Sequence, residues 1–262
     1  MTRVELAHMT WKQASEARDR GAVVLIPIGT QEQNGSISPL ASDTLVAVEV
    51  ARQVAQQSDA LMAPPIHYGY SPIFRHYPGS VCLRPDTLRM MILDVCENLI
   101  ENGFDHLLLV NCHNANEPIM EHAAMDIRER LGVLMGYFNP INLAQSASKD
   151  LYAGMDACLG HGSEPIASML RSFIPESVYL ESARFGGWKD FQNLPVAGTS
   201  KVTVGGATFG LYFTNDDVME TGGTGDPTAS NPQRGAEIMH RVVDLASGYV
   251  RAFAGLKTRS GN

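Results

Sequence analysis

The chain has 262 residues, of which 44% are hydrophobic and 18% charged, and its formal net charge at pH 7 is −8. This length and composition are ordinary for a globular protein that buries a sizeable core, and one α/β domain spanning residues 1–262 is the simplest expectation. The negative charge argues against nucleic-acid binding, which needs a basic surface. The sequence contains no run of about 18 apolar residues, so it predicts no membrane-spanning segment.

The N-terminal 20 residues form an amphipathic pattern that lacks the apolar centre of a signal peptide. Within them, Thr10 is a good N-cap for a helix from Trp11 to Arg20, which Gly21 would end. Four cysteines occur without a CxxC pair, so no disulfide framework is required. We therefore expect a cytoplasmic protein.

Apolar runs then alternate with amphipathic segments, which indicates βαβ units around a mainly parallel sheet. The strands are expected at residues 22–28, 60–63, 106–110 and 133–138, and the helices between them at 43–57, 85–103 and 118–131. Residues 140–160 are small and polar, and a further helix is expected to start near Ser163-Glu164-Pro165. Residues 175–226 are rich in glycine and predict loops with short strands, and residues 231–253 predict a closing helix.

The most informative segment is residues 23–44, where an apolar strand passes through Gly29 into a polar loop. That loop presents Glu32 and Asn34, and Asp43 follows at the start of the next helix. Open α/β sheets bind their ligands at the carboxyl ends of the strands. Two acids on one such loop therefore predict a bound cation.

Two later loops offer further ligand types, namely His113 after the strand at 106–110, and His161 with Glu164 ahead of the next helix. Carboxylates combined with imidazoles suit Zn, Mn or Fe(II). A water molecule on such an ion has its pKa lowered toward about 7, which makes it a hydroxide nucleophile at neutral pH. His161 is a candidate for donating a proton to the leaving group.

Several motifs resemble those of the creatininase family. IPIGTQEQNGSISPLASDT, at residues 26–44, resembles the family's opening motif PxGSxEQHGPHLPLxTDT. VNCHNAN at 110–116 is similar to VNGHGGN, and HGSEPIAS at 161–168 to HAGExETS. YPGSVCLRPDTL at 77–88 and GDPTAS at 225–230 resemble FPGTxSLxxxTL and GDPTxA. These pieces occur in the family's order and extend over nearly the whole chain.

The resemblance implies a metal-dependent hydrolase with a three-layer α/β sandwich around a mainly parallel sheet, usually assembled as a hexamer. It places Glu32, Asp43 and His113 on a first metal ion, with Asp43 bridging to a second ion. Because Ala115 stands where some members carry an acid, it assigns Glu164 to the second ion. His161 corresponds to the histidine assigned to substrate binding or proton transfer.

The chain also departs from the family pattern. Asn34 replaces a histidine, and a carboxamide oxygen is a weaker ligand for Zn than for Mn or Mg. Ile166 replaces the second acid of HAGExETS, and Asn114 and Ala115 replace two glycines. The number of ions, one or two, therefore stays open, and a substrate other than creatinine is expected.

Simpler structural roles exist for the same residues. Glu32 could accept loop N–H groups, Asp43 could cap a helix, and His113 could be a hydrogen-bonded histidine at a strand end. Glu164 could be an acid favoured by a helix N-terminus. Cys112 beside His113 has no base-activated arrangement and is expected to be a buried apolar group.

We expect a hydrolase that acts on a small, cyclic amide by attack of a metal-bound hydroxide on the carbonyl carbon. Two alternatives stay open at this point. The first is hydrolytic C–C cleavage that opens a cyclic diketone such as a dehydrogenated inositol, and the second is a degenerate member that binds a ligand without turnover. In each case the partner is a small molecule.

Overall fold

The computed structural model describes residues 4–259. Its centre is a parallel sheet with the strand order β2-β1-β3-β4. The strands are β1 (Val24–Ile28), β2 (Leu61–Met62), β3 (Leu107–Asn111) and β4 (Gly136–Phe138). All four predicted strands are present. β1, β2 and β4 are shorter than their apolar runs, and β3 is shifted by one residue from 106–110.

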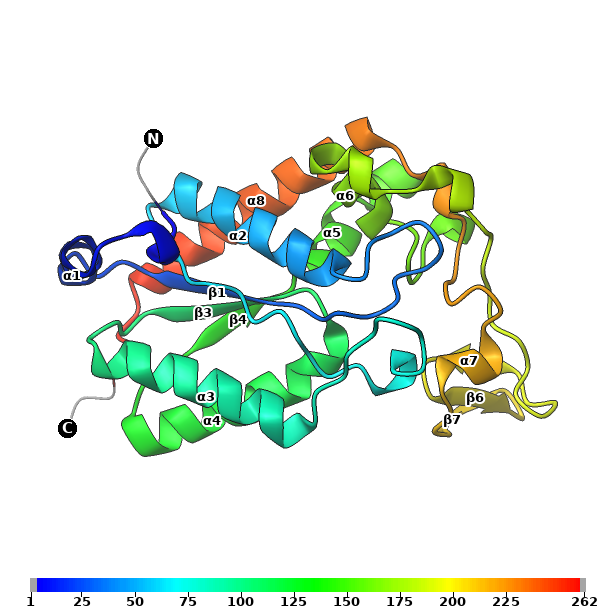
Figure 1. Ribbon diagram of the computed structural model, residues 1–262, viewed down its shortest axis with the longest axis horizontal. Helices are drawn as coiled ribbons and strands as arrows, with labels where there is room; N and C mark the ends of the chain where they lie inside the picture. The colour runs from blue at the N-terminus through cyan, green and yellow to red at the C-terminus, as the bar shows by residue number, and fades with distance from the viewer. Residues whose placement is uncertain (1–3, 260–262) are drawn as a thin grey trace.

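Helices cover both faces of this sheet, as Figure 1 shows. On one face lie α2 (Ser42–Ser58) and the closing helix α8 (Pro232–Ala254), and on the other lie α3 (Pro85–Glu101) and α4 (Glu117–Leu131). The expected three-layer α/β sandwich is therefore confirmed. The N-terminal helix α1 (Trp11–Asp19) begins at Thr10, whose side chain forms the expected cap together with Gln13.

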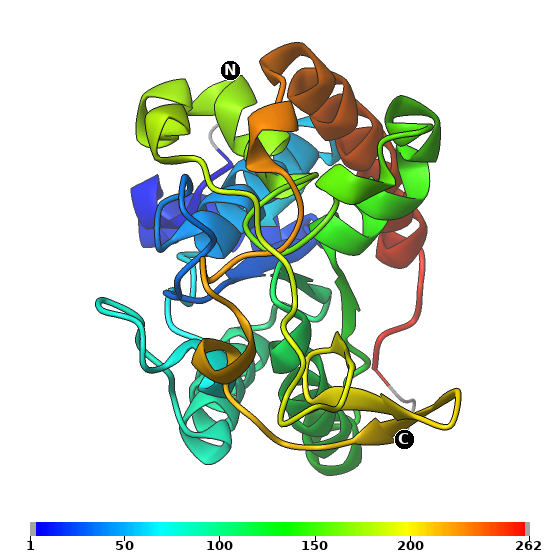
Figure 2. The same ribbon diagram turned by 90° about the vertical axis from the view of Figure 1, so that its right-hand side faces the viewer.

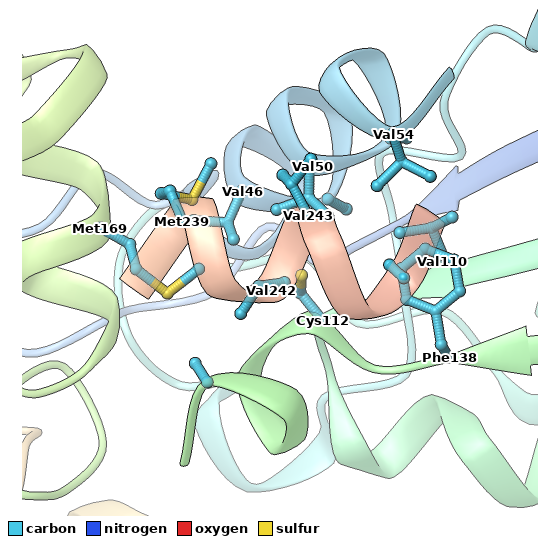
Figure 3. Close-up of a cluster of buried hydrophobic side chains, with 14 of the residues drawn as sticks. Val46, Val50, Val54, Val110, Cys112, Phe138, Met169, Met239, Val242 and Val243 are labelled. Atoms are coloured by element: carbon cyan, nitrogen blue, oxygen red, sulfur yellow. The ribbon is translucent and has the colours of Figure 1, made fainter. Parts of the chain in front are cut away.

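The central strands are buried on both faces, which explains why they read as continuous apolar runs. Alternate side chains enter different cores. Leu25 packs with α2 and α8 in one hydrophobic cluster, whereas Val24 and Ile26 pack with α3 and α4 in the other. Figure 3 shows the first of these cores, in which valines of α2 and α8 pack above Val110 of β3.

The segment between β4 and α8 contains α5 (Pro140–Ala147), α6 (Ile166–Phe173), α7 (Asn215–Val218) and a second, antiparallel sheet. This small sheet consists of β5 (Val196–Gly198), β6 (Lys201–Val204) and β7 (Ala207–Gly210). It lies beyond the carboxyl ends of the central strands (Figures 1 and 2). The expectation of loops and short strands here is met, but α5 has no counterpart in the predicted elements.

Short 3₁₀ turns complete the structure: η1 (Leu6–His8), η2 (Pro72–Phe74), η3 (Asn114–Asn116), η4 (Lys149–Tyr152), η5 (Asp156–Cys158), η6 (Pro175–Ser177), η7 (Leu180–Ser182) and η8 (Pro227–Ala229). Within residues 4–259, no helix combines the length and the apolar character needed to cross a bilayer. The four cysteines are all free thiols.

Candidate metal centre

Three ionisable side chains meet at the carboxyl edge of the central sheet. β1 and β3 are neighbours in parallel register, with Ile28 opposite Asn111, so the loops that follow them leave the sheet side by side. The first loop carries Glu32 and the second carries His113. Asp43 lies in the first turn of α2, and its carboxylate, instead of capping that helix, accepts a hydrogen bond from Thr30.

One potential ligand atom from each of Glu32, Asp43 and His113 lies within 4.8 Å of the others. Nδ1 of His113 is 3.1 Å from Oδ2 of Asp43 and 3.4 Å from Oε1 of Glu32. Among residues 4–259, this is the only group of three or more His, Cys, Asp or Glu side chains that converges in this way. Three of the predicted ligands are therefore brought together from separate loops.

Neighbouring hydroxyl groups orient the two carboxylates. The Ser71 hydroxyl donates to Oε2 of Glu32, which leaves Oε1 facing His113. The Thr30 hydroxyl donates to Oδ2 of Asp43 at 2.6 Å. Hydrogen bonds of this kind hold ligand side chains in position around a metal ion.

The His113 ring is oriented by a backbone carbonyl. Its Nε2 lies 3.1 Å from the carbonyl oxygen of Tyr70, so Nε2–H donates to that oxygen when the ring is neutral. This tautomer leaves the lone pair of Nδ1 directed at the two carboxylates. A backbone acceptor behind a histidine is the usual arrangement in metal sites.

The close packing of the cluster shifts the pKa values of Glu32 and His113. Burial, assisted by the nearby Asp43 carboxylate, raises the pKa of Glu32 to about 7 against the opposing effect of His113. Burial alone would lower the pKa of His113, but the charge of Glu32 and the hydrogen bond with Asp43 raise it to about 9. Two anions packed around one imidazole therefore attract positive charge, which a cation could supply.

Asn34 lies beside the cluster with an unsatisfied oxygen. Its Nδ2 is 3.4 Å from Oδ1 of Asp43, while its buried Oδ1 has no hydrogen-bond partner among residues 4–259. Leaving a buried carbonyl oxygen unpaired costs about 1–3 kcal/mol, which a metal ligand bond would relieve. The donor set of two carboxylates, one imidazole and this orphan oxygen fits a divalent ion.

Glu164 has partners of its own. Its Oε2 accepts from the Tyr152 hydroxyl at 2.6 Å and its Oε1 from the Ser168 hydroxyl at 2.6 Å, and Arg234 lies 3.6 Å from Oε1. The side chain reaches the wall of the same cavity, but it is not part of the three-residue cluster. Its role at a second ion stays a prediction, and no motif in the sequence identifies Tyr152 or Arg234 as its partners.

His161 stands at the cavity next to the cluster. Its ring stacks on Phe74 with centroids 4.2 Å apart, and its Nε2 lies 3.0 Å from the carbonyl oxygen of Gln33. Burial lowers the pKa of His161 to about 4, so the ring is neutral at pH 7. With Nε2–H donating to Gln33, Nδ1 is the atom that can accept a proton.

Two glycines allow this loop to approach the cluster. Gly162 and Gly35 both have φ of +70°, and their backbones pack directly against each other. A Cβ on Gly162 would lie 2.3 Å from the backbone nitrogen of Gly35, a distance that real Cβ atoms do not tolerate. The close contact places His161 beside the loop that carries Glu32 and Asn34.

The cluster opens into a cavity of about 810 Å³. Its floor includes Glu32, Asp43 and His113, and its walls combine apolar and polar side chains from distant parts of the chain: Ile73, Phe74, Ile141, Gln145, His161, Trp188, Lys201, Asn215 and Met219. A cavity of this volume is large enough to enclose a drug-sized ligand. The sequence offered no way to align Trp188 with the site.

Cys112 is directed into the hydrophobic core, where Figure 3 shows it below α8 close to Val242. Burial raises the pKa of its thiol well above the ordinary value. A thiol held neutral in this way is a poor nucleophile. The interpretation of Cys112 as a buried apolar group agrees with this position.

Comparison with known proteins identifies relatives that match most of the chain. A creatininase family model, described as creatinine amidohydrolase, matches residues 7–250. The mycofactocin precursor peptide peptidase of Mycobacterium ulcerans is 29% identical over 230 residues, which are 84% of this chain and 81% of that protein.

Two further relatives match over shorter stretches. The creatinine amidohydrolase of Pseudomonas putida is 30% identical over 133 residues, 48% of this chain and 51% of that protein. The 3-dehydro-scyllo-inosose hydrolase of Thermotoga maritima is 32% identical over 114 residues, 43% of this chain and 36% of that protein. The chain thus matches about half or less of the length of these two proteins.

Solved structures show the same fold. A structure described as "Creatininase Mn" superimposes with a TM-score of 0.79 at 20% identity, covering 97% of this chain and all of that one. The structure of a putative creatinine amidohydrolase from Bacteroides fragilis gives a TM-score of 0.79 at 19% identity, covering 99% of this chain and all of that one.

Proposed function

The chain belongs to the creatininase family, and we propose that it is a metal-dependent hydrolase that cleaves the C–N bond of an amide in a small molecule. The observation that carries this proposal is the convergence of Glu32, Asp43 and His113 at the floor of one large cavity. Relatives in the family are hydrolases, and two of those compared are named for the cleavage of amide or peptide bonds.

Each residue of the site has a distinct part in this proposal. Glu32 and Asp43 supply anionic oxygens and His113 supplies Nδ1, so that together they would hold a divalent ion. When bound, such an ion lowers the pKa of a water molecule and polarises a substrate carbonyl. His161, neutral and fixed by Phe74, would accept a proton at Nδ1 and return it to the leaving nitrogen.

We propose one ion per subunit. The residues that would serve a second ion are altered or occupied, because Ala115 carries no ligand atom and both oxygens of Glu164 accept hydrogen bonds within the protein. An oxygen-rich donor set that includes the Asn34 carboxamide favours Mn over Zn, with Fe(II) also compatible.

The substrate is proposed to be an amide, and the small cyclic amide expected from the sequence is one candidate. The creatinine amidohydrolase of Pseudomonas putida supports a cyclic substrate. The mycofactocin peptidase, which matches far more of the chain, supports an acyclic amide. In both kinds of substrate, the bond that is cleaved is the C–N bond of an amide.

A second candidate is hydrolytic C–C cleavage, which the 32% identity to the inosose hydrolase of Thermotoga maritima favours. The products separate the two reactions, since release of an amine requires C–N cleavage and a chain-opened keto acid requires C–C cleavage. A member that binds a ligand without turnover is the remaining alternative. That alternative predicts protein with little metal and no response to chelators.

The proposal is tested by assaying the protein against creatinine, other small cyclic amides and dipeptides, and measuring the released amine. We expect hydrolysis of at least one amide, its loss after treatment with a chelator, and its recovery on addition of Mn²⁺. Hydrolysis that persists in metal-free protein would contradict the proposal.

Family resemblance further suggests a homohexamer of the 28.4-kDa chain. Light scattering of the purified protein measures this directly, and a monomeric mass would overturn it. The cytoplasmic location expected from the sequence also stays a prediction.

A further inference from the structure

We propose that Lys201 and Asn215 form a subsite that binds a carboxylate group of the substrate. This inference rests on the proposed function and specifies its substrate class, namely an amide that also carries a free carboxylate. The two residues lie on the wall of the cavity whose floor is Glu32, Asp43 and His113.

The subsite comes from a separate part of the fold. Lys201 begins β6 of the small antiparallel sheet, and Asn215 begins α7. Figure 1 shows this sheet and α7 beyond the carboxyl ends of the central strands, next to the edge that carries the acids. Trp188 and Met219, from the same segment, line the cavity beside them. A ligand held at the floor would therefore meet residues of this segment.

The charges of the cavity are unbalanced in favour of an anion. A divalent ion at the floor would match the charges of Glu32 and Asp43, and Arg234 lies 3.6 Å from Glu164. Lys201, an exposed residue at the rim of this cavity, then has no counter-charge in it. Among the described residues that line the cavity it is the only lysine or arginine, and no carboxylate of residues 4–259 pairs with it. A substrate carboxylate would supply the missing counter-charge.

Asn215 provides a second and independent observation. Its side chain is 1% exposed, and within residues 4–259 neither its Nδ2 nor its Oδ1 has a hydrogen-bond partner. Buried carboxamides almost always make hydrogen bonds. The unpaired Nδ2 and Oδ1 of Asn215, a residue of the cavity wall, therefore indicate that a bound ligand supplies their partner. The amide N–H of Asn215 would donate to a carboxylate oxygen after a small side-chain rotation.

The volume and the lining of the cavity indicate what joins the two ends of the ligand. Apolar side chains also line the cavity, among them Ile141, Trp188 and Met219. The volume of about 810 Å³ exceeds what a single small ring needs. An amide of an amino acid with an apolar or aromatic acyl group has the required features.

Hippurate (N-benzoylglycine) and hippuramide, in which a neutral carboxamide replaces the carboxylate, are matched probes for the test. Their dissociation constants are measured by titration calorimetry with the Mn²⁺-loaded protein. We expect hippurate to bind roughly 10- to 100-fold more tightly, the range associated with hydrogen bonds to a charged group. In Lys201→Met the preference should fall below about twofold, and in Asn215→Leu it should be reduced.

Lys12→Met is the control, because this substitution removes the same charge as Lys201→Met. Lys12 lies on α1 and is not among the residues that line the cavity. The control should retain the full preference, and metal content should be equal in all variants. Equal binding of acid and amide by the unaltered protein, binding of neither, or a preference that survives Lys201→Met would overturn the inference. Metal-dependent hydrolysis of neutral amides without any preference for acids would leave the proposed function standing and remove only this subsite.

Discussion

Thr30, Ser71 and Tyr70 determine which atoms of the metal cluster face its centre. Each makes one hydrogen bond to a different member of the cluster. The bonds of Ser71 and Tyr70 leave Oε1 of Glu32 and Nδ1 of His113 directed into the cluster, whereas Thr30 bonds to Oδ2 of Asp43, the oxygen that also faces His113. The cluster is thus preorganised at the level of single atoms, which lowers the cost of ordering it when an ion binds.

Thr30→Val keeps the shape of the side chain but removes the hydroxyl that donates to Asp43 at 2.6 Å. We expect the affinity for Mn²⁺ to fall roughly 10- to 100-fold, the usual effect of losing a hydrogen bond to a metal ligand. Metal titration followed by calorimetry measures this. Thr30→Ser, which retains the hydroxyl, should bind nearly as tightly as the unaltered protein, and an equal loss in both variants would show that the hydrogen bond is not responsible.

The residues of the cluster were predictable because they follow apolar strands, and the carboxyl ends of parallel strands share an edge. The residues that make hydrogen bonds to the cluster could not be predicted in this way. Ser71 and Tyr70 lie in the long loop between β2 and α3, where no periodic pattern relates a residue to a position in space. Lys201 and Asn215 lie in a glycine-rich segment, which also lacks a periodic pattern from which their positions in space could be predicted.

At the scale of elements, the start of α6 is held by a network around Glu164. Tyr152 of η4 and Ser168 of α6 donate to this carboxylate, and Arg234 of α8 lies over the Tyr152 ring at 5.1 Å. The helices α6 and α8 pack closely here. The network ties the loop that carries His161 to the closing helix.

Glu164→Gln tests whether this carboxylate serves the fold or an ion. Because the change removes a buried charge that accepts two hydrogen bonds, we expect the free energy of unfolding to fall by about 1–3 kcal/mol. Metal content should not change. Chemical denaturation and metal analysis of the same sample measure both quantities, and loss of metal without loss of stability would instead establish Glu164 as a ligand.

The loops after β1 and β3 are where this chain differs from the family pattern, at Asn34 and Ala115. The double variant Asn34→His/Ala115→Glu adds an imidazole beside Asp43 and a carboxylate in the loop that follows His113, and both are better ligands than the residues they replace. We expect the number of bound ions to rise from one to two in a titration with Zn²⁺ or Mn²⁺. A stoichiometry of one in the double variant would contradict our alignment of these loops.

Element types were predicted better than element ends. The parallel strands were recognised as apolar runs, yet β2 and β4 are shorter than their runs because only part of each run pairs with a neighbour. The small, polar residues 140–160 predict no helix, yet α5 forms there. Pro140 fits a first helical turn, and the Asn139 side chain caps the helix by accepting from two backbone N–H groups.

At the scale of the whole molecule, the site joins parts that are distant in the sequence. β1, β3 and α2 supply the cluster, and the small sheet with α7 supplies the far wall of the cavity. The loops that carry the cluster follow β1 and β3, strands whose side chains enter both hydrophobic cores of the sheet. Binding of an ion should therefore stabilise the fold as a whole and not one loop alone.

Thermal unfolding measures this coupling. An ion that binds only the folded chain adds about 2.7 kcal/mol at a free concentration of 100 times its dissociation constant. For a chain of this size we expect the melting temperature of chelator-treated protein to rise by about 5–10 °C on addition of Mn²⁺. Mg²⁺ at equal concentration should shift it less, and an unchanged melting temperature at saturating Mn²⁺ would contradict a site built into the fold.

The central claim is that Glu32, Asp43 and His113 hold one divalent ion, and metal analysis of protein purified without added metal or chelator tests it most directly. We expect about one equivalent of a divalent transition metal per chain, and almost none in Asp43→Ala, with the folded state of the variant verified by circular dichroism. Asp59→Ala, at the end of α2, should retain the full amount. Less than about half an equivalent in the unaltered protein, or equal metal in Asp43→Ala, would contradict the account.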